Sequence, residues 1–218
     1  MKIYEIHNGM VWHNRRYDLG LMGIPKCMST TLKNQFGLTK LGHITNLPES
    51  MINNKKIISI VRDPLIRYVS GYLESMISTS DYPKGRYHMI PLPDGLKGKL
   101  NNLFMVKDEI VKFKKFTDYI FEYGYFEPHI VQQVDYIRDL KTKSFYKNIN
   151  IFKLEHITNL ENFLGHKLKT LNISEHQLLK KSLIQFIRTD NEYKEKIENL
   201  YNEDINFYKS FNEKTITK

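Results

Sequence analysis

The stretch Leu19–Gly37, LGLMGIPKCMSTTLKNQFG, decides the fold that the sequence predicts. Its first part, Leu19–Ile24, is apolar throughout, which is typical of a short buried strand. Pro25 predicts a tight turn, and a helix is predicted to begin in Thr31–Phe36. Lys26–Thr31, with one lysine and three consecutive hydroxyl side chains, therefore joins a strand to the start of a helix. That end of a helix carries unpaired N–H groups and the positive end of the dipole, which suit a phosphate or a sulfate.

This stretch alone leaves two interpretations open. The glycine pattern GxxxxGK[ST] of the Walker A loop is absent, so the segment is not an ordinary ATP-binding loop. An ordinary strand–turn–helix, in which the hydroxyl side chains only cap the helix, fits the same residues equally well.

A second strand–turn–helix follows. The nearly continuous β-branched run Lys56–Val61, KIISIV, predicts a strand buried on both faces, as in a parallel sheet covered by helices. Asp63 is placed as the N-cap of the next helix and Pro64 as its first residue. The apolar face of that helix consists of Leu65, Tyr68, Val69, Tyr72, Leu73 and Met76. Two such units predict an α/β fold, with a ligand crevice at the carboxyl ends of parallel strands.

The remaining chain is predicted more coarsely. We expect an N-terminal extension at 1–17 with room for a short strand, a loop at 38–54, a long loop at 78–99 and a frayed tail at 212–218. A strand is predicted at 150–154, and helices at 107–123, 128–140, 156–164 and within 174–212. The side chains expected in the core of the later helices are Ile110, Phe113, Ile120, Phe121, Tyr193, Tyr201, Phe207 and Tyr208.

Composition sets the broad class. The 218 residues suit a single domain spanning 1–218, and a formal charge of +9 favours polyanionic partners such as nucleic acid, acidic glycans, nucleotide phosphates or acidic lipid. A single cysteine excludes an intrachain disulfide. The N-terminus is polar and no apolar run is long enough to span a bilayer, so we expect a soluble, cytoplasmic protein without membrane contact.

Taken together in order, the two units resemble a known family. P-K-x-x-S-T-T-L followed by V-R-D-P-x-x-R-x-x-S-x-Y is similar to the sulfotransferases that use 3′-phosphoadenosine 5′-phosphosulfate (PAPS). The first segment resembles their 5′-phosphosulfate loop and the second their 3′-phosphate motif; many members have glycine at the position of Met28. The cofactor-binding residues that this resemblance implies are Pro25, Lys26, Cys27, Met28, Ser29, Thr30, Thr31, Arg62 and Ser70.

Within that family the chain most resembles the carbohydrate branch, which includes the heparan sulfate 2-O-sulfotransferases. The segment Gly42–Thr45, G-H-I-T, resembles the segment that carries the catalytic base of that branch. Glu127-Pro128-His129 with Gln132 or Gln133, followed by 148–165, resembles a later stretch of related carbohydrate enzymes. The resemblance implies a P-loop-kinase-like three-layer α/β fold, with a central, mostly parallel sheet flanked by helices.

The implied activity is transfer of a sulfuryl group from PAPS to a hydroxyl of an acceptor, with a carbohydrate as the expected acceptor and 3′-phosphoadenosine 5′-phosphate (PAP) as the product. His43 would take the hydroxyl proton, because histidine exchanges protons near neutral pH. Lys26 would stabilise the charge that develops on the leaving phosphate, and Arg62 with Ser70 would hold the 3′-phosphate. The resemblance implies no metal.

Other assignments are weaker. His129 is a candidate for acceptor binding or for a second base, and Tyr82 and Arg86 in the long loop are candidates for contacts with sugars. Glu155 is expected either to contact the substrate or to cap the next helix. The competing functions are a P-loop-like small-molecule or nucleotide kinase, a basic nucleic-acid-binding protein, and a nucleotide-binding protein without catalysis; no nucleic-acid-binding motif is present, and the oligomeric state stays open.

Overall fold

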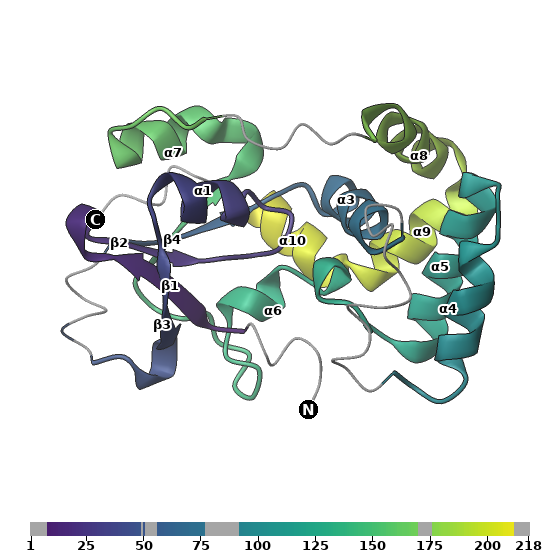
Figure 1. Cartoon of the computed structure of the whole chain (residues 1–218), viewed down its shortest axis with the longest axis horizontal. Helices are drawn as coiled ribbons and strands as arrows, with labels where there is room; N and C mark the ends of the chain where they lie inside the picture. The colour runs from purple at the N-terminus through teal and green to yellow at the C-terminus, as the bar shows by residue number, and fades with distance from the viewer. Residues whose placement is uncertain (1–7, 49, 51–55, 77–91, 170–175, 212–218) are drawn as a thin grey trace. The chain divides into compact units, whose positions relative to one another are not determined.

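The computed structural model describes residues 8–48, 50, 56–76, 92–169 and 176–211 (Figure 1). Tyr82, Arg86 and the tail at 212–218 therefore lie outside the described residues. The chain divides into two compact units. The sheet unit comprises 2–64, 132–173 and 203–218, and the helical unit comprises 65–131 and 174–202. The prediction of one domain over 1–218 stays a prediction.

A five-stranded sheet in the order β3-β1-β2-β4-β5 forms the centre of the sheet unit. β1 is antiparallel to β2 and to β3, whereas β2 pairs with β4 and β4 with β5 in parallel. Four strands therefore run in one direction, and the predicted α/β class, with a mostly parallel sheet and flanking helices, is confirmed. The strands are β1 (Met10–Asn14), β2 (Leu19–Met22), β3 (Thr39–His43), β4 (Lys56–Val61) and β5 (Ile149–Lys153).

The register brings the carboxyl ends of these four strands to one edge of the sheet. Leu21 of β2 lies opposite Ile58 of β4, and Val61 at the end of β4 lies opposite Lys153 at the end of β5. On the other side of β2, Val11 of β1 lies opposite Met22. The segments that follow β2, β3, β4 and β5 all leave the sheet from this edge, which we call the carboxyl edge.

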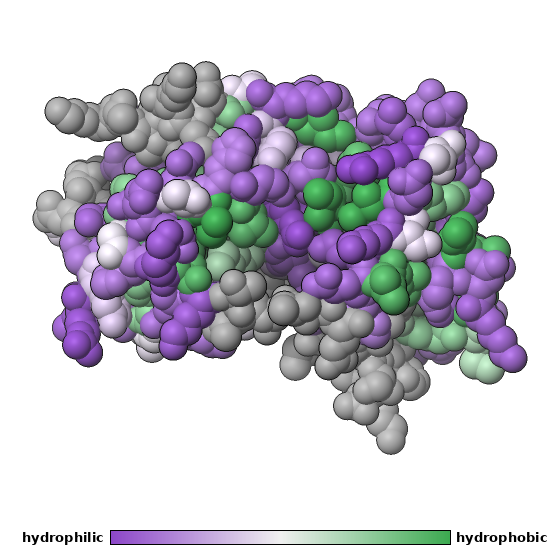
Figure 2. Space-filling model, turned by 90° about the horizontal axis from the view of Figure 1, so that it is seen from above, coloured by the Kyte–Doolittle hydropathy of each residue, from purple (hydrophilic) through white to green (hydrophobic). Residues whose placement is uncertain are grey.

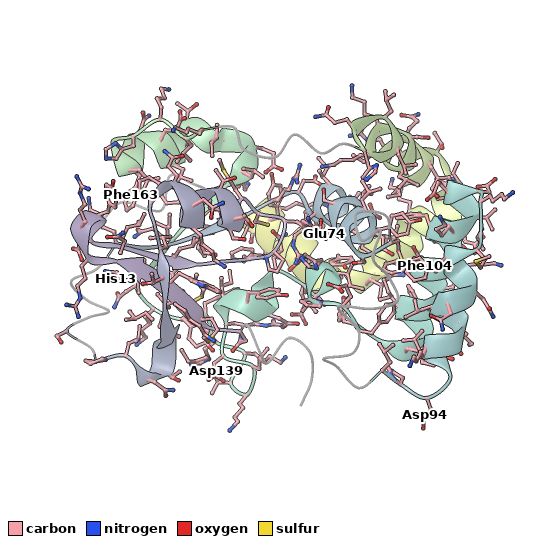
Figure 3. The ribbon with its side chains drawn as sticks, in the orientation of Figure 1. His13, Glu74, Asp94, Phe104, Asp139 and Phe163 are labelled. Atoms are coloured by element: carbon pink, nitrogen blue, oxygen red, sulfur yellow. The ribbon has the colours of Figure 1, made fainter. Side chains whose placement is uncertain are left out.

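The prediction of an N-terminal extension is corrected by β1. Residues 10–14 form an internal strand between β3 and β2. Val11 and His13 point to one side of β1 and are 1% and 5% exposed (His13 is labelled in Figure 3). The loop predicted at 38–54 likewise contains β3, which pairs with β1. Both strands are short and rich in polar residues, so their alternation is too weak to recognise without the pairing partner.

Among the described residues, four helices belong mainly to the sheet unit. They are α1 (Ser29–Gln35), α6 (Val134–Ile137), α7 (Ile157–Leu164) and α10 (Asn202–Ser210), and short 3₁₀ turns lie at Arg15–Tyr17, Ile44–Asn46 and Leu154–His156. α7 packs on β5, with the rings of Phe152 and Phe163 centred 5.1 Å apart (Phe163 is labelled in Figure 3). The helix predicted over 128–140 is wrong: only the 3₁₀ turn at Pro128–Ile130 and the single turn α6 form there.

The helical unit contains α3 (Pro64–Met76), α4 (Leu96–Phe104), α5 (Glu109–Tyr123), α8 (Gln177–Thr189) and α9 (Asn191–Leu200). α4 packs along α5, and α5 also contacts α8 and α9 (Figure 1). The start of α4 corrects the end of the long loop predicted at 78–99. The predicted helical character of 174–212 is confirmed wherever the structure describes it.

The buried face of α5 differs in part from the prediction. Phe113 and Ile120 are 0% and 1% exposed, as predicted. Ile110 and Phe121 are 37% and 47% exposed, and Phe116 takes the core position instead. The buried face is centred on residues 113, 116, 117 and 120, which recur at the three- and four-residue spacing of one helix face, and Ile110 and Phe121 lie beside it.

α3 is the most deeply buried helix of the helical unit. Tyr68 shares a hydrogen bond of 2.7 Å with the Thr117 hydroxyl, and burial raises the pKa of its phenol. Arg67 is 0% exposed and donates from Nη1 to the Val131 carbonyl over 2.6 Å. Gly71 faces the carbonyl oxygen of His129, which a side-chain Cβ would strike. Close backbone approach therefore requires glycine at this position.

The surface is mostly hydrophilic on the face drawn in Figure 2, where hydrophobic residues form separate small groups. None of the helices within the described ranges is both long and apolar enough to cross a lipid bilayer.

Lys33 of α1 lies over Trp12 of β1, with its Nζ atom 3.3 Å from the ring centroid. The ring attracts the charged ammonium, whereas burial favours the neutral amine. Burial dominates and lowers the pKa of Lys33 from its ordinary 10.5 to about 8. Trp12 is the single tryptophan of the chain, so its fluorescence reports on this contact.

We expect the Trp12 fluorescence of the folded protein to titrate with a midpoint near pH 8, because Lys33 loses its charge there. Lys33→Met should abolish this transition while keeping the side-chain volume. Because the folded pKa lies below the ordinary value, the free energy of unfolding should also rise as pH increases from about 8 towards 10.5. A fluorescence midpoint above pH 10, or the same transition in Lys33→Met, would contradict this assignment.

Candidate functional site

The loop Lys26–Thr31 follows β2 and has an unusual backbone. Lys26 and Met28 are both left-handed, with φ of 64° and 65°. Residues other than glycine adopt this conformation at a cost of roughly 1–2 kcal/mol each. Glycine adopts it freely, which gives a physical reason why glycine suits the position of Met28. Such strain is found disproportionately at ligand-binding sites, where the surrounding structure maintains it.

The side chains of this loop divide into buried and accessible groups. Cys27 and Thr31 are 1% and 3% exposed, so their side chains are packed inside the sheet unit. Ser29 is partly exposed and Thr30 is exposed. Of the three consecutive hydroxyls, two therefore reach the surface and one packs in the core. Pro25, Lys26 and Met28 are also partly exposed.

Arg62 brings the second predicted motif to the first. It follows β4 directly, and its Nη1 atom donates to the Lys26 carbonyl over 3.4 Å. β2 and β4 are neighbouring parallel strands, so both segments leave the carboxyl edge side by side. The lysine and the arginine that the sequence assigned to opposite ends of one nucleotide thus belong to neighbouring loops of the sheet unit.

Gln133 connects these two loops. Its Oε1 atom accepts from the Arg62 N–H over 2.7 Å and from the Cys27 thiol over 3.2 Å. Its Nε2 atom donates to the Arg62 carbonyl over 2.8 Å. Asp204 of α10 accepts from the N–H groups of Gln133 and Val134, over 2.7 and 2.9 Å. Sequence reasoning named Gln132 or Gln133 only through the resemblance and did not find Asp204, whose contact lies 71 residues away.

The segment after β5 contacts the segment that follows β4. Glu155 accepts from the Asp63 N–H over 3.0 Å and from the Tyr208 hydroxyl over 2.8 Å. The Nζ atom of Lys153 lies 4.5 Å from the centroid of the Tyr208 ring. The prediction that Glu155 caps the helix after it is wrong, because its carboxylate accepts from Asp63 and Tyr208 instead. Tyr208 was predicted to lie in the core, but it is half-buried and its hydroxyl donates to Glu155.

Ser70 lies on α3 in the helical unit. Its hydroxyl donates to the Ile66 carbonyl one turn earlier, over 2.8 Å. This local bond is common for serine within helices. The assignment of Ser70 to a 3′-phosphate stays a prediction.

His43 is the last residue of β3 and therefore stands at the carboxyl edge. Met10 of β1 lies opposite it, so His43 is two strand spacings from β2, about 10 Å. The Thr45 N–H donates to its Nδ1 atom over 3.3 Å, and the Thr45 hydroxyl lies 2.7 Å from the same atom. Because Nδ1 accepts, the neutral ring carries its proton on Nε2, the atom that faces Gly9.

His129 in the helical unit has the opposite arrangement. Its Nδ1 atom contacts the carboxylate of Glu127, and its backbone N–H donates to the same oxygen over 3.0 Å. Glu127 is 4% exposed. An ionised carboxylate only accepts hydrogen bonds, so in the neutral ring Nδ1 carries the proton and Nε2 keeps a lone pair. This is the tautomer that a general base requires at Nε2.

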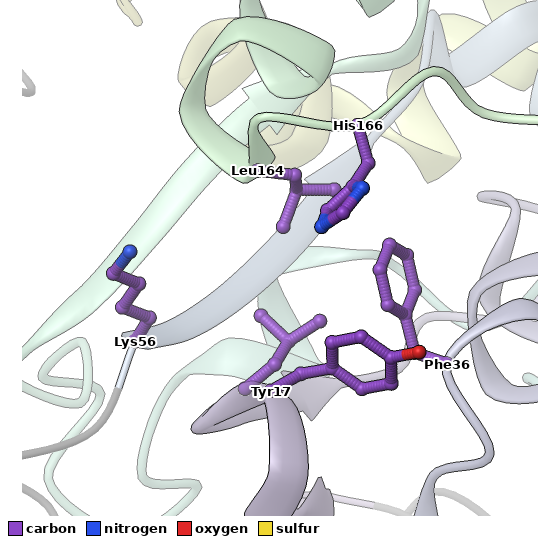
Figure 4. A pocket seen from close by; sticks show the side chains of 6 residues that line it. Tyr17, Phe36, Lys56, Leu164 and His166 are labelled. Atoms are coloured by element: carbon purple, nitrogen blue, oxygen red, sulfur yellow. The ribbon is translucent and has the colours of Figure 1, made fainter.

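A small pocket of about 50 Å³ lies elsewhere in the sheet unit (Figure 4). The rings of Tyr17, Phe36 and His166 line it, with centroids 5.3 to 6.2 Å apart. Leu19 and Lys56, at the starts of β2 and β4, complete it together with Leu164. The pocket therefore lies at the amino ends of these strands, away from the carboxyl edge.

The groups at the carboxyl edge suit an anion. Lys26 and Arg62 supply positive charge, and Ser29 and Thr30 supply hydroxyl groups. Within the described ranges, no three His, Cys, Asp or Glu side chains are grouped so that they could hold a metal ion.

Comparisons of the chain with protein-family models, with curated proteins and with solved structures found no match. The candidate site therefore rests on its own residues and geometry.

Proposed function

We propose that this protein is a PAPS-dependent sulfotransferase that transfers a sulfuryl group to a hydroxyl, with a carbohydrate as the expected acceptor. One observation carries the proposal: Arg62 donates to the Lys26 carbonyl, so the two segments that resemble the nucleotide-binding motifs adjoin at one sheet edge. The parallel pairing of β2 with β4 places both segments at this edge, as binding of one nucleotide by both segments requires. The finer description of the fold as P-loop-kinase-like belongs to the same proposal.

Each end of the nucleotide has its own group of residues in this proposal. Lys26, Ser29 and Thr30, with the N–H groups of 28–31, would bind the 5′-phosphosulfate. Cys27 and Thr31 are buried, so they would contribute through their backbone and by supporting the loop. Arg62 would bind the 3′-phosphate through its guanidinium fork.

The chemistry follows from the charges. The acceptor oxygen attacks the sulfur atom as its proton passes to a base, and the bond between sulfur and the bridging phosphate oxygen breaks. The 5′-phosphate of the departing PAP carries one more negative charge than it did in PAPS, and Lys26 and the loop N–H groups would stabilise that charge. His43 is proposed as the base because it lies in the same unit and at the same edge as the loop. It would take the proton at Nδ1, giving up its bond with Thr45.

The proposed role of Arg62 at the 3′-phosphate disfavours the kinase alternative. A kinase for ATP has no use for a second anion site that recognises a 3′-phosphate, and Arg62 would be such a site. AMP and PAP differ by this phosphate alone, so a comparison between them isolates its contribution.

We expect PAP to raise the melting temperature much more than AMP does. Ligand at 100 times its Kd stabilises a protein by about 2.7 kcal/mol, which corresponds to roughly 5–10 °C for a chain of this size. Arg62→Met should reduce the PAP shift to the AMP value, because the 3′-phosphate loses its guanidinium partner. Differential scanning fluorimetry measures all four combinations. Equal shifts by PAP and AMP in the unmodified protein would refute the assignment of Arg62.

We also expect His43→Ala to keep the PAP-induced shift but to lose about 10²- to 10⁴-fold in turnover, the usual contribution of a general base. Turnover is measured with radiolabelled PAPS and a panel of glycans and small hydroxyl compounds. His129→Ala is the matched control and should keep turnover. The reverse result would assign the base to His129, whose tautomer already has an accepting Nε2 atom.

A further inference from the structure

Gln133 is nearly inaccessible to solvent, at 1% exposure, yet it uses both ends of its amide on the two candidate nucleotide-binding loops. We propose that Gln133 is a positioning residue that fixes Arg62 beside the loop Lys26–Thr31 and thereby sets selectivity for a nucleotide with a 3′-phosphate. This inference rests on the proposed function.

The pairing of Gln133 with Arg62 is reciprocal. The side-chain oxygen accepts from the Arg62 N–H over 2.7 Å, and the side-chain nitrogen donates to the carbonyl of the same residue over 2.8 Å. Two bonds to one residue fix the orientation of its backbone as well as its position. Because the amide is buried, water does not compete for these bonds, and their loss would leave polar backbone atoms without partners.

The third bond of the amide reaches the other loop. The Cys27 thiol donates to the same Oε1 atom over 3.2 Å. Cys27 lies between the two left-handed residues Lys26 and Met28, so its position affects the shape of the whole loop. The side-chain amide of Gln133 therefore connects the loop Lys26–Thr31 to the backbone of Arg62.

Asp204 anchors Gln133 from behind. Both carboxylate oxygens accept backbone N–H groups, from Gln133 and Val134, and Asp204 is 1% exposed. Hydrogen bonds to a charged carboxylate are stronger than neutral ones. The backbone of Gln133 is thus attached to α10, which fixes the point from which its side-chain amide reaches Arg62.

The selectivity follows from which contact depends on Gln133. Binding of the 3′-phosphate would depend on Arg62, so a misplaced guanidinium would lower the affinity for PAP. AMP lacks that phosphate and would depend on the Lys26–Thr31 loop, whose bond to Gln133 is the weaker one that the Cys27 thiol donates, so AMP binding should change much less. A purely structural residue would weaken both nucleotides alike, so the ratio of the two affinities distinguishes positioning from general stability.

The test compares Gln133→Leu with Gln132→Leu in the full chain. Gln132 is the neighbouring glutamine, and its buried Oε1 atom makes no hydrogen bond within the part of the chain that the structure describes. Calorimetric titration with PAP and AMP should show PAP binding to Gln133→Leu weakened roughly 10- to 100-fold, as expected for lost buried hydrogen bonds, with AMP affinity changed less than about 3-fold. Gln132→Leu should bind both nucleotides like the unmodified protein. Equal weakening of PAP and AMP in Gln133→Leu would overturn the inference.

A second readout does not require nucleotide. Cys27 is the single cysteine, and a thiol reagent should label it at least tenfold faster in Gln133→Leu than in the unmodified protein or in Gln132→Leu. An unchanged labelling rate would overturn the claim that Gln133 holds the loop. If the unmodified protein bound neither nucleotide, the proposed function would fail, and labelling would still decide the structural part. Should Gln133→Leu not fold, Gln133→Asn keeps the amide but shortens its reach, and the same two readouts apply.

Discussion

The parallel pairing of β2 with β4 is the constraint on which the candidate site depends. Leu19 lies opposite Lys56 and Leu21 opposite Ile58, so the two strands end at the same edge and their following segments are neighbours. Arg62 can reach the Lys26 carbonyl only because of this register. Residues 57–61 of β4 are buried on both faces, and the pairing with β2 on one side and β5 on the other holds the register on which the site depends.

The site is maintained by groups that lie behind it. Two left-handed residues, Lys26 and Met28, carry a cost that the loop alone would not tolerate. The buried Cys27, the Gln133 amide and the Asp204 carboxylate form a connected set of hydrogen bonds on the inner side. The outer side keeps cationic and hydroxyl groups. Preorganised anion binding requires this arrangement, in which buried hydrogen-bonded groups support accessible cationic and hydroxyl groups.

The sequence predicted the elements whose signal is local. The apolar run of β2, the β-branched run of β4 and the Pro64 start of α3 were found because each is continuous in the chain. β3 was missed, and β1 was expected only as a short strand of an extension, because the place of a short strand in a sheet depends on its pairing partners. Gln133 and Asp204 were not assigned roles because their contacts span about 70 residues, and no spacing rule relates a buried carboxylate to a distant turn. Cys27 and Thr31 matched a motif, but only the fold shows that their side chains are buried.

The central claim is that the Lys26–Thr31 loop and Arg62 bind opposite ends of a single adenosine bisphosphate. A crystal structure of the protein with PAP tests it most directly. The account predicts the 5′-phosphate within hydrogen-bonding distance of Lys26 and the N–H groups of 28–31, and the 3′-phosphate paired with the Arg62 guanidinium. A nucleotide bound at the Tyr17–His166 pocket instead, or one whose 3′-phosphate points into solvent away from Arg62, would contradict it.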